Sequence, residues 1–179
     1  MIAPPLVDSH VHLDRYPDDT VAAMLQRAAR AGVGRLLTVG VDLPASRAAL
    51  DLASRWPAGD GPVGRPIGDA VRPVVLAAVG IHPTRLAVLG ASGDPIDRLR
   101  RLLAPEAEAG VPGDRAALPH RPAAIGEVGL DDAAADPDGQ RRFLDRCLGL
   151  AVERNRPVVL HVAGRVTGLP TAIQQPASR

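Results

Sequence analysis

The chain has 179 residues, of which 46% are hydrophobic, and this length and composition suit one folded domain with a single core. Its 21 basic and 20 acidic side chains leave a net charge of +1, which excludes a highly charged disordered chain and nucleic-acid binding driven by bulk charge. A single cysteine, Cys147, excludes an intramolecular disulfide and a thiolate metal cluster. The apolar runs are too short to span a membrane and the sequence shows no signal-peptide pattern, so we expect a cytoplasmic protein.

Short apolar runs alternate along the chain with segments in which apolar residues recur every three or four positions. This alternation is typical of strands and helices that build a parallel sheet with both faces covered. Glycine and proline concentrate in three stretches, which predicts loops at residues 58–73, 110–122 and 164–176. In chain order, the pattern predicts strand 6–13, helix 19–31, strand 35–41, helix 44–55, strand 74–81, helix 95–103, strand 123–128, helix 138–155 and strand 157–162. The last helix places Cys147 on its apolar stripe, so we expect a core residue there and not a reactive thiol.

The predicted element order fits two α/β architectures, a doubly wound open sheet or part of a barrel. A nucleotide-binding open sheet carries a glycine-rich phosphate loop after its first strand, and the sequence has no such loop there. Instead, histidines and a carboxylate lie at or near the ends of the predicted strands. The C-terminal ends of barrel strands meet at one rim, where barrel enzymes carry out their chemistry. The polar residues that favour part of a barrel are His10, His12, His82, Glu127 and His161.

Four of these residues together predict a metal site with nitrogen and oxygen ligands. His10 and His12 are two positions apart on a predicted strand, so both side chains project from one face and can reach the same divalent cation. Glu127 lies in an apolar strand, where an ionised carboxylate needs a cation or hydrogen-bond donors; a salt bridge to an arginine is the alternative. His161 ends the run V-V-L-H, and its alternative is a buried histidine bonded to the backbone.

Four segments resemble, in matching order, the signatures of TatD-like metal-dependent hydrolases. They are D-S-H-V-H-L-D at residues 8–14, V-G-I-H-P at 79–83, I-G-E-V-G-L-D at 125–131, and a last segment with Gln140, Phe143 and P-V-V-L-H at 157–161. The resemblance covers residues 6–162 and implies an α/β fold, a partial (β/α)8 barrel with about five β/α units. Residues 163–179 do not match the family pattern, and we expect an irregular tail there.

The resemblance also implies roles for individual residues. His10 and His12 match the paired metal ligands of the first strand. Glu127 matches the carboxylate that contacts or bridges the metals, and His161 matches the ligand at the end of the fifth strand. His82 matches a histidine that lines the substrate pocket. The implied cofactors are one or two divalent ions, Zn, Mg or Mn.

The commonest activity assigned to this family is hydrolysis of nucleic acid phosphodiesters, often as a DNase. The resemblance therefore implies a metal-dependent hydrolase that acts on single-stranded DNA or another phosphoester. A complete barrel of this type takes about 250 residues, and the family's sixth-strand histidine and eighth-strand aspartate have no counterpart in this chain. That aspartate is the expected catalytic group, so no catalytic residue is assigned. We expect a chain shortened by truncation or frameshift, with weak metal binding and little or no turnover.

Two other functions remain open at this stage. One is a catalytically inactive remnant that persists as an interaction partner. The other keeps the enzyme class and changes the substrate to an amide, a lactone or another phosphate ester, because related barrels use similar ligands for these reactions. A five-strand fragment would also leave both outer strands without a neighbour, so low solubility or pairing with another chain is expected.

Overall fold

The computed structural model describes residues 6–56, 66–67, 70–71, 73–86, 89, 93–103 and 121–164. Its main feature is a five-stranded parallel sheet with the strand order β1-β2-β5-β6-β7. The short strands β3 (Pro66–Ile67) and β4 (Ala70–Val71) form a separate antiparallel pair. The strands of the main sheet span, in order, Leu6–Val11, Val33–Val39, Val74–Val79, Ala124–Asp131 and Val158–Ala163.

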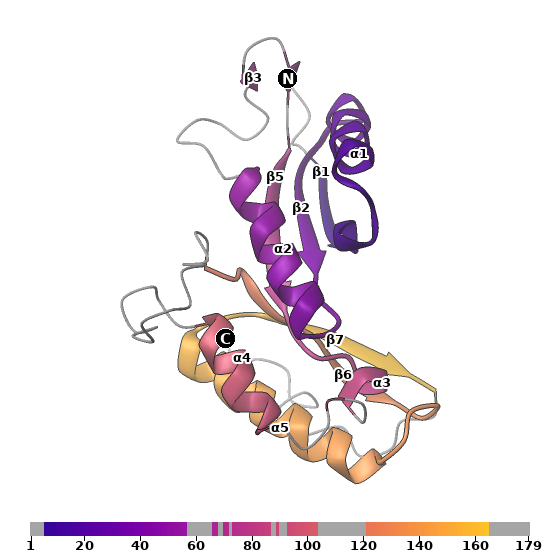
Figure 1. Ribbon diagram of the computed structural model, residues 1–179, viewed down its shortest axis with the longest axis vertical. Helices are drawn as coiled ribbons and strands as arrows, with labels where there is room; N and C mark the ends of the chain where they lie inside the picture. The colour runs from indigo at the N-terminus through magenta and orange to yellow at the C-terminus, as the bar shows by residue number, and fades with distance from the viewer. Residues whose placement is uncertain are drawn as a thin grey trace, which may run out of the picture.

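A helix lies between each strand of the main sheet and the next one. The strand order in the sheet therefore follows the chain order, as in a barrel wound in one direction, whereas a doubly wound sheet reverses its order at a switch point. Figure 1 shows the strands turning steeply relative to one another between β2 and β7. The predicted part of a barrel is confirmed, in the form of a curled half-barrel. The connecting helices are α1 (Asp18–Arg30), α2 (Leu43–Arg55), α4 (Pro95–Leu103) and α5 (Pro137–Arg154).

The predicted strands and helices are all present, with ends that differ by a few residues. β6 continues to Asp131, past the predicted end at residue 128, because its pairing with β7 extends through Asp131 and Ala163. Sequence periodicity missed η1 (Leu13–Arg15), α3 (Pro83–Leu86) and the β3–β4 pair, which lies in the predicted loop 58–73, because elements this short leave no periodic pattern. The other two predicted loops and the tail at residues 163–179 fall almost entirely outside the described residues.

Aspartate caps start the two helices that follow β2 and β6. The Asp42 carboxylate accepts a hydrogen bond from the N–H of Ala45 at 2.9 Å, and the Asp136 carboxylate accepts one from Gly139 at 2.9 Å. Such bonds satisfy N–H groups that lack a partner within the first helical turn. A proline lies at the start of each helix, where its missing N–H removes no helical bond. These caps give the chain a defined path as it leaves each strand.

Two apolar clusters lie on opposite faces of the sheet. The larger one packs the helices against the strands and contains Leu25, Leu50, Leu99, Leu144 and Ile125 among others. Cys147 belongs to this cluster and has no exposed surface, which confirms the prediction of a core residue. Its burial raises the pKa of the thiol to about 12. The smaller cluster consists of Val39, Ala78 and Ala124. None of the helices in the described ranges is long and apolar enough to cross a membrane.

Candidate metal centre

The five predicted site residues come from four strands or the segments that follow them. His10 lies in β1, and His12 comes directly after this strand. His82 lies between β5 and α3, Glu127 lies in β6, and His161 lies in β7. The curl of the sheet brings these residues into one cluster around the Glu127 carboxylate.

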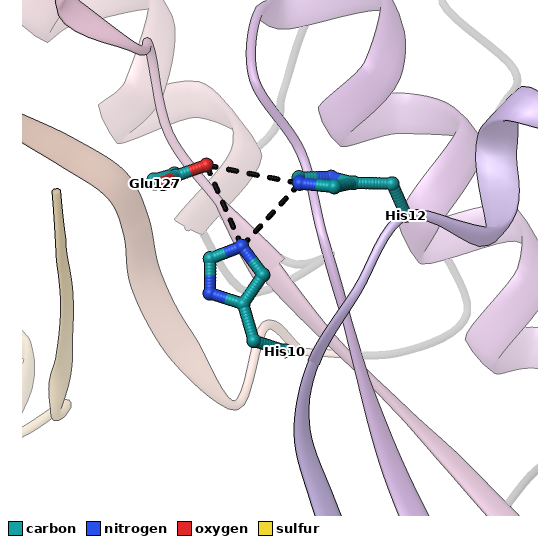
Figure 2. A group of neighbouring side chains, drawn as sticks. All are labelled: His10, His12 and Glu127. Carbon is teal, nitrogen blue, oxygen red and sulfur yellow. Dashed lines mark hydrogen bonds and ion pairs between the residues drawn. The ribbon is translucent and has the colours of Figure 1, made fainter.

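His10, His12 and Glu127 point toward a common centre, as Figure 2 shows. The Nε2 atoms of the two histidines are 3.3 Å apart. Glu127 Oε2 lies 3.6 Å from His10 Nε2 and 3.8 Å from His12 Nε2. One nitrogen or oxygen atom from each residue can therefore serve as a ligand of a single ion, because these atoms all lie within 4.8 Å of one another.

The hydrogen bond of His12 to the backbone decides which of its nitrogens is free. His12 Nδ1 lies 2.8 Å from the carbonyl oxygen of Val39, and a carbonyl can only accept, so Nδ1 carries the proton. In the neutral ring, Nε2 then carries a lone pair that points at the Glu127 carboxylate. Both Nε2 and the carboxylate are hydrogen-bond acceptors. Two acceptors at this distance repel each other unless a cation or a proton lies between them. The donor set of two imidazoles and a carboxylate fits a divalent cation.

His161 faces the other oxygen of Glu127. Its Nδ1 lies 3.1 Å from Glu127 Oε1, and its Nε2 lies 3.1 Å from Asp131 Oδ2. The ring of His82 packs edge-on against the ring of His161, with 4.1 Å between their centroids. His82, Glu127 and His161 form a second group whose ligand atoms lie within 4.8 Å of one another. The two oxygens of one carboxylate thus face two separate groups of histidines.

The arrangement differs from the two structural alternatives that the sequence left open. Glu127 is only 7% exposed. Within the described residues, its two oxygens face histidines and not an arginine. His161 directs both ring nitrogens at carboxylates instead of backbone groups. A buried ionised carboxylate surrounded by imidazoles needs a cation between them, or hydrogen bonds donated by the rings, to compensate its charge.

Glycines let the backbone of Glu127 approach the neighbouring strand ends. The N–H of Glu127 donates a hydrogen bond to the carbonyl of Gly40 at 3.0 Å. A Cβ atom at Gly80 would collide with the backbone of Gly126 and Glu127, so only glycine permits this close approach. The position of the carboxylate is therefore set by tight backbone packing between β2, β5 and β6.

The environment shifts the pKa of two groups in the cluster. Burial lowers the pKa of His82, and the neighbouring His161 lowers it further, so the His82 ring stays neutral at neutral pH. The N–H of Ala133 lowers the pKa of Asp131, and its contact with His161 acts in the same direction, so this carboxyl group is ionised. An ionised Asp131 is a fixed hydrogen-bond acceptor for an imidazole.

Sequence reasoning assigned no role to Asp131, although the residue ends a quoted motif. The missed signal is the period-two alternation of a strand, because residues 127, 129 and 131 point to the same face. The predicted strand ends at residue 128, so its alternation stops short of Asp131.

The family model described as TatD related DNase matches residues 66–174, more than half of the chain. The chain is 30% identical over 166 residues to the "Uncharacterized metal-dependent hydrolase TatD" of Mycobacterium tuberculosis. It is 31% identical over 161 residues to the "Uncharacterized metal-dependent hydrolase YjjV" of Escherichia coli. Each match covers 87% of this chain but 51% and 49% of the two relatives, so the chain spans about half the length of the curated relatives it matches.

Two solved structures resemble the described fold. The crystal structure of the TatD homologue YJJV from Escherichia coli superposes with a TM-score of 0.61 at 29% identity, covering 89% of this chain and 51% of that one. A hydrolase TatD family protein from Entamoeba histolytica superposes with a TM-score of 0.59 at 21% identity, covering 91% of this chain and 51% of that one. The second likeness concerns the fold alone.

Proposed function

Because this chain belongs to the TatD family, we propose that its histidine and glutamate cluster binds divalent cations and serves the hydrolysis of nucleic acid phosphodiesters. The single observation that carries the proposal is the Glu127 carboxylate, whose two oxygens face separate histidine groups. The names of two relatives, both called metal-dependent hydrolases, support metal-dependent hydrolysis. The description of the matching family model, TatD related DNase, supports the nucleic acid substrate. The proposed ligands are His10, His12, Glu127 and His161, with His82 beside them in the substrate pocket.

The donor set favours zinc over magnesium. The proposed ligands comprise three imidazoles, of His10, His12 and His161, and one carboxylate, of Glu127. Magnesium prefers an octahedron of oxygen ligands, whereas imidazole suits zinc and other transition metals. When bound here, such cations supply Lewis-acid activation of water and neutralise the charge of a phosphoryl group.

The protein's own residues prepare the site for this chemistry. The Val39 carbonyl holds His12 in the tautomer that leaves Nε2 free as a ligand atom. Glu127 presents one oxygen to each histidine group, so one buried charge serves both. We assign no general base for the activation of water among the described residues.

His82 is proposed as a hydrogen-bond donor to substrate and not as a ligand. Its Nδ1 accepts a hydrogen bond from the N–H of Thr84 at 3.2 Å and lies 2.7 Å from the Thr84 hydroxyl. In the neutral ring, the proton is therefore on Nε2, which has no lone pair for a cation. An N–H in this position can bind an acceptor such as a phosphate oxygen.

Zinc titration of purified protein tests the metal site. We expect saturable zinc binding by calorimetry, with an affinity that falls at least about 100-fold in Glu127→Gln, because one carboxylate contributes to both ligand groups. Glu153→Gln is the matched control, since Glu153 is half-exposed and pairs with Arg100 on the helical surface. Equal zinc affinity in the two variants would contradict the proposed site.

The substrate class is tested separately on the zinc- or manganese-loaded chain. We expect slow cleavage of a single-stranded oligonucleotide and of a simple phosphodiester, because the chain lacks the family's catalytic aspartate, and none of either by Glu127→Gln. Cleavage of a lactone or an amide in place of these phosphodiesters would support the alternative in which the chain keeps the enzyme class and acts on another substrate. Metal binding without any turnover would favour the inactive interaction partner.

A further inference from the structure

We infer that Asp131 is a positioning residue for His161: it holds the proton on Nε2, so that Nδ1 faces Glu127 as a ligand atom. The inference deepens the proposed metal site and rests on it. It concerns a carboxylate outside the proposed ligand set, 3.1 Å from the ring of one ligand.

The register of β6 and β7 places Asp131 beside His161. Gly129 lies opposite His161 in the parallel pair, and Asp131 lies opposite Ala163. Residue 131 is two positions beyond Gly129, so its side chain is on the same face of the sheet. A Cβ atom at Gly129 would collide with the backbone of His161, and the glycine therefore lets the two strands come close enough for the contact.

Asp131 is held in place by its own side chain and by its backbone. The Asp131 Oδ1 atom accepts a hydrogen bond from the N–H of Ala133 at 3.0 Å, which leaves Oδ2 for His161. Gln140, which is 2% exposed, accepts a bond from the Asp131 N–H through Oε1 at 2.8 Å. Its Nε2 group lies 3.2 Å from the Asp131 carbonyl oxygen. Hydrogen bonds that do not involve His161 therefore hold both the carboxylate and the backbone of Asp131 in place.

This anchoring decides the tautomer of His161. Both ring nitrogens face a carboxylate, but a neutral imidazole can donate through only one of them. Glu127 is shared with His10 and His12, whereas Asp131 has His161 as its imidazole contact. Proton donation to Asp131 leaves the Nδ1 lone pair facing the shared carboxylate, where a cation can lie. Histidine ligands commonly donate their second ring N–H to a carboxylate in this way.

Substitution of Asp131 by asparagine reverses the donor pattern without changing the shape. The N–H of Ala133 selects the amide oxygen of the new side chain, so its NH₂ group would face His161 Nε2. A donor at this position requires a lone pair on Nε2, which moves the proton to Nδ1. The ligand nitrogen would then be blocked while the packing stays nearly the same.

The test combines zinc affinity with the protonation pattern of the ring. We expect Asp131→Asn to weaken zinc binding by about 10–100-fold in calorimetry, and Asp138→Asn to leave it unchanged. Asp138 is the matched control because its side chain is 79% exposed and pairs with Arg141 on the surface. Thermal melting without metal verifies that both variants fold.

The ring itself is read by nitrogen-15 NMR of the zinc-loaded protein with labelled histidine. The His161 signal is identified by its loss in His161→Asn. In the unmodified chain we expect a protonated Nε2 and a metal-bound Nδ1. In Asp131→Asn we expect the proton on Nδ1, a shift that a purely structural role of Asp131 would not produce. The measurement on the unmodified chain still tests the inference if Asp131→Asn does not fold, because a protonated Nδ1 there would overturn it.

The outcomes separate this inference from the proposed function. A zinc-loaded protein with a protonated Nδ1 overturns the role of Asp131, and so does equal zinc affinity in the Asp131 and Asp138 variants. Failure of the unmodified chain to bind zinc overturns the proposed metal site itself, and the inference with it.

Discussion

Single buried polar groups tie the strand ends around the cluster together. Ser46 in α2 has no exposed surface, and its hydroxyl forms hydrogen bonds with both the carbonyl and the N–H of Gly80 at 3.1 Å. Gly80 in turn packs against the backbone of Glu127. One hydroxyl therefore connects a helix to the strand end that supports the central carboxylate.

We expect Ser46→Ala to lower the free energy of unfolding by about 1–3 kcal/mol, because it leaves the two buried backbone groups of Gly80 without this partner. Urea denaturation followed by circular dichroism measures the change. Ser54→Ala is the control, since the Ser54 hydroxyl donates to the Asp51 carbonyl on the exposed surface of the same helix. A similar loss of stability in both variants would refute the role of Ser46.

At the scale of whole elements, an ion pair connects α4 to α5 on the outside of the half-barrel. Two nitrogens of Arg146 lie 2.9 and 2.5 Å from the carboxylate oxygens of Asp94. The Asp94 carboxylate also accepts a bond from the N–H of Ile96 at the start of α4. The pKa of Asp94 is lowered, first by Arg146 and then by this N–H.

The lowered pKa gives the pair a defined dependence on pH. The stabilisation is present above the ordinary pKa of 3.8 and is lost as the pH falls through the lower value in the folded protein. We therefore expect Asp94→Asn to lower the melting temperature at neutral pH, with a difference that shrinks below pH 3.8. Asp145→Asn, an exposed change on α5, serves as the control. A difference that stays constant down to acid pH would contradict this account.

Over the whole molecule, the curled sheet remains open at two edges in the part of the chain that the structure describes. There, β1 pairs with β2 and β7 pairs with β6. Apolar side chains on these two outer strands are exposed, with Leu6 at 61%, Val7 at 63% and Val162 at 47%. Unpaired strand edges with exposed apolar residues favour pairing with other chains.

We expect the purified chain to associate as its concentration rises, because the edges of β1 and β7 can pair between molecules. Sedimentation velocity over a concentration series measures this. Val7→Lys and Val162→Lys should reduce association, since a charge on an edge strand opposes pairing. Val152→Lys is the control: Val152 is 83% exposed but lies on α5. Association that is unchanged by the edge substitutions, or a monomer at every concentration, would refute the prediction.

The elements of the fold could be predicted because helices and strands follow from local periodicity. The helix that contains Cys147 illustrates this, since its apolar stripe indicated a core residue that the structure confirms. The end of β6 was wrong by three residues, at 128 and not 131, because it depends on pairing with β7 and not on the apolar run itself. Asp131 lies in these three residues, so the predicted strand does not include it.

By itself, the sequence determined the order of the elements and the identity of the polar residues at the strand ends, because both are written in nearby residues. Only the tertiary structure decided that Glu127 directs its two oxygens at different histidines and that Asp131 contacts His161. The contacts of His161 with Glu127 and Asp131 join residues that are 30 or more positions apart in the sequence. Their distances depend on strand register and on the curl of the sheet, which no local pattern specifies.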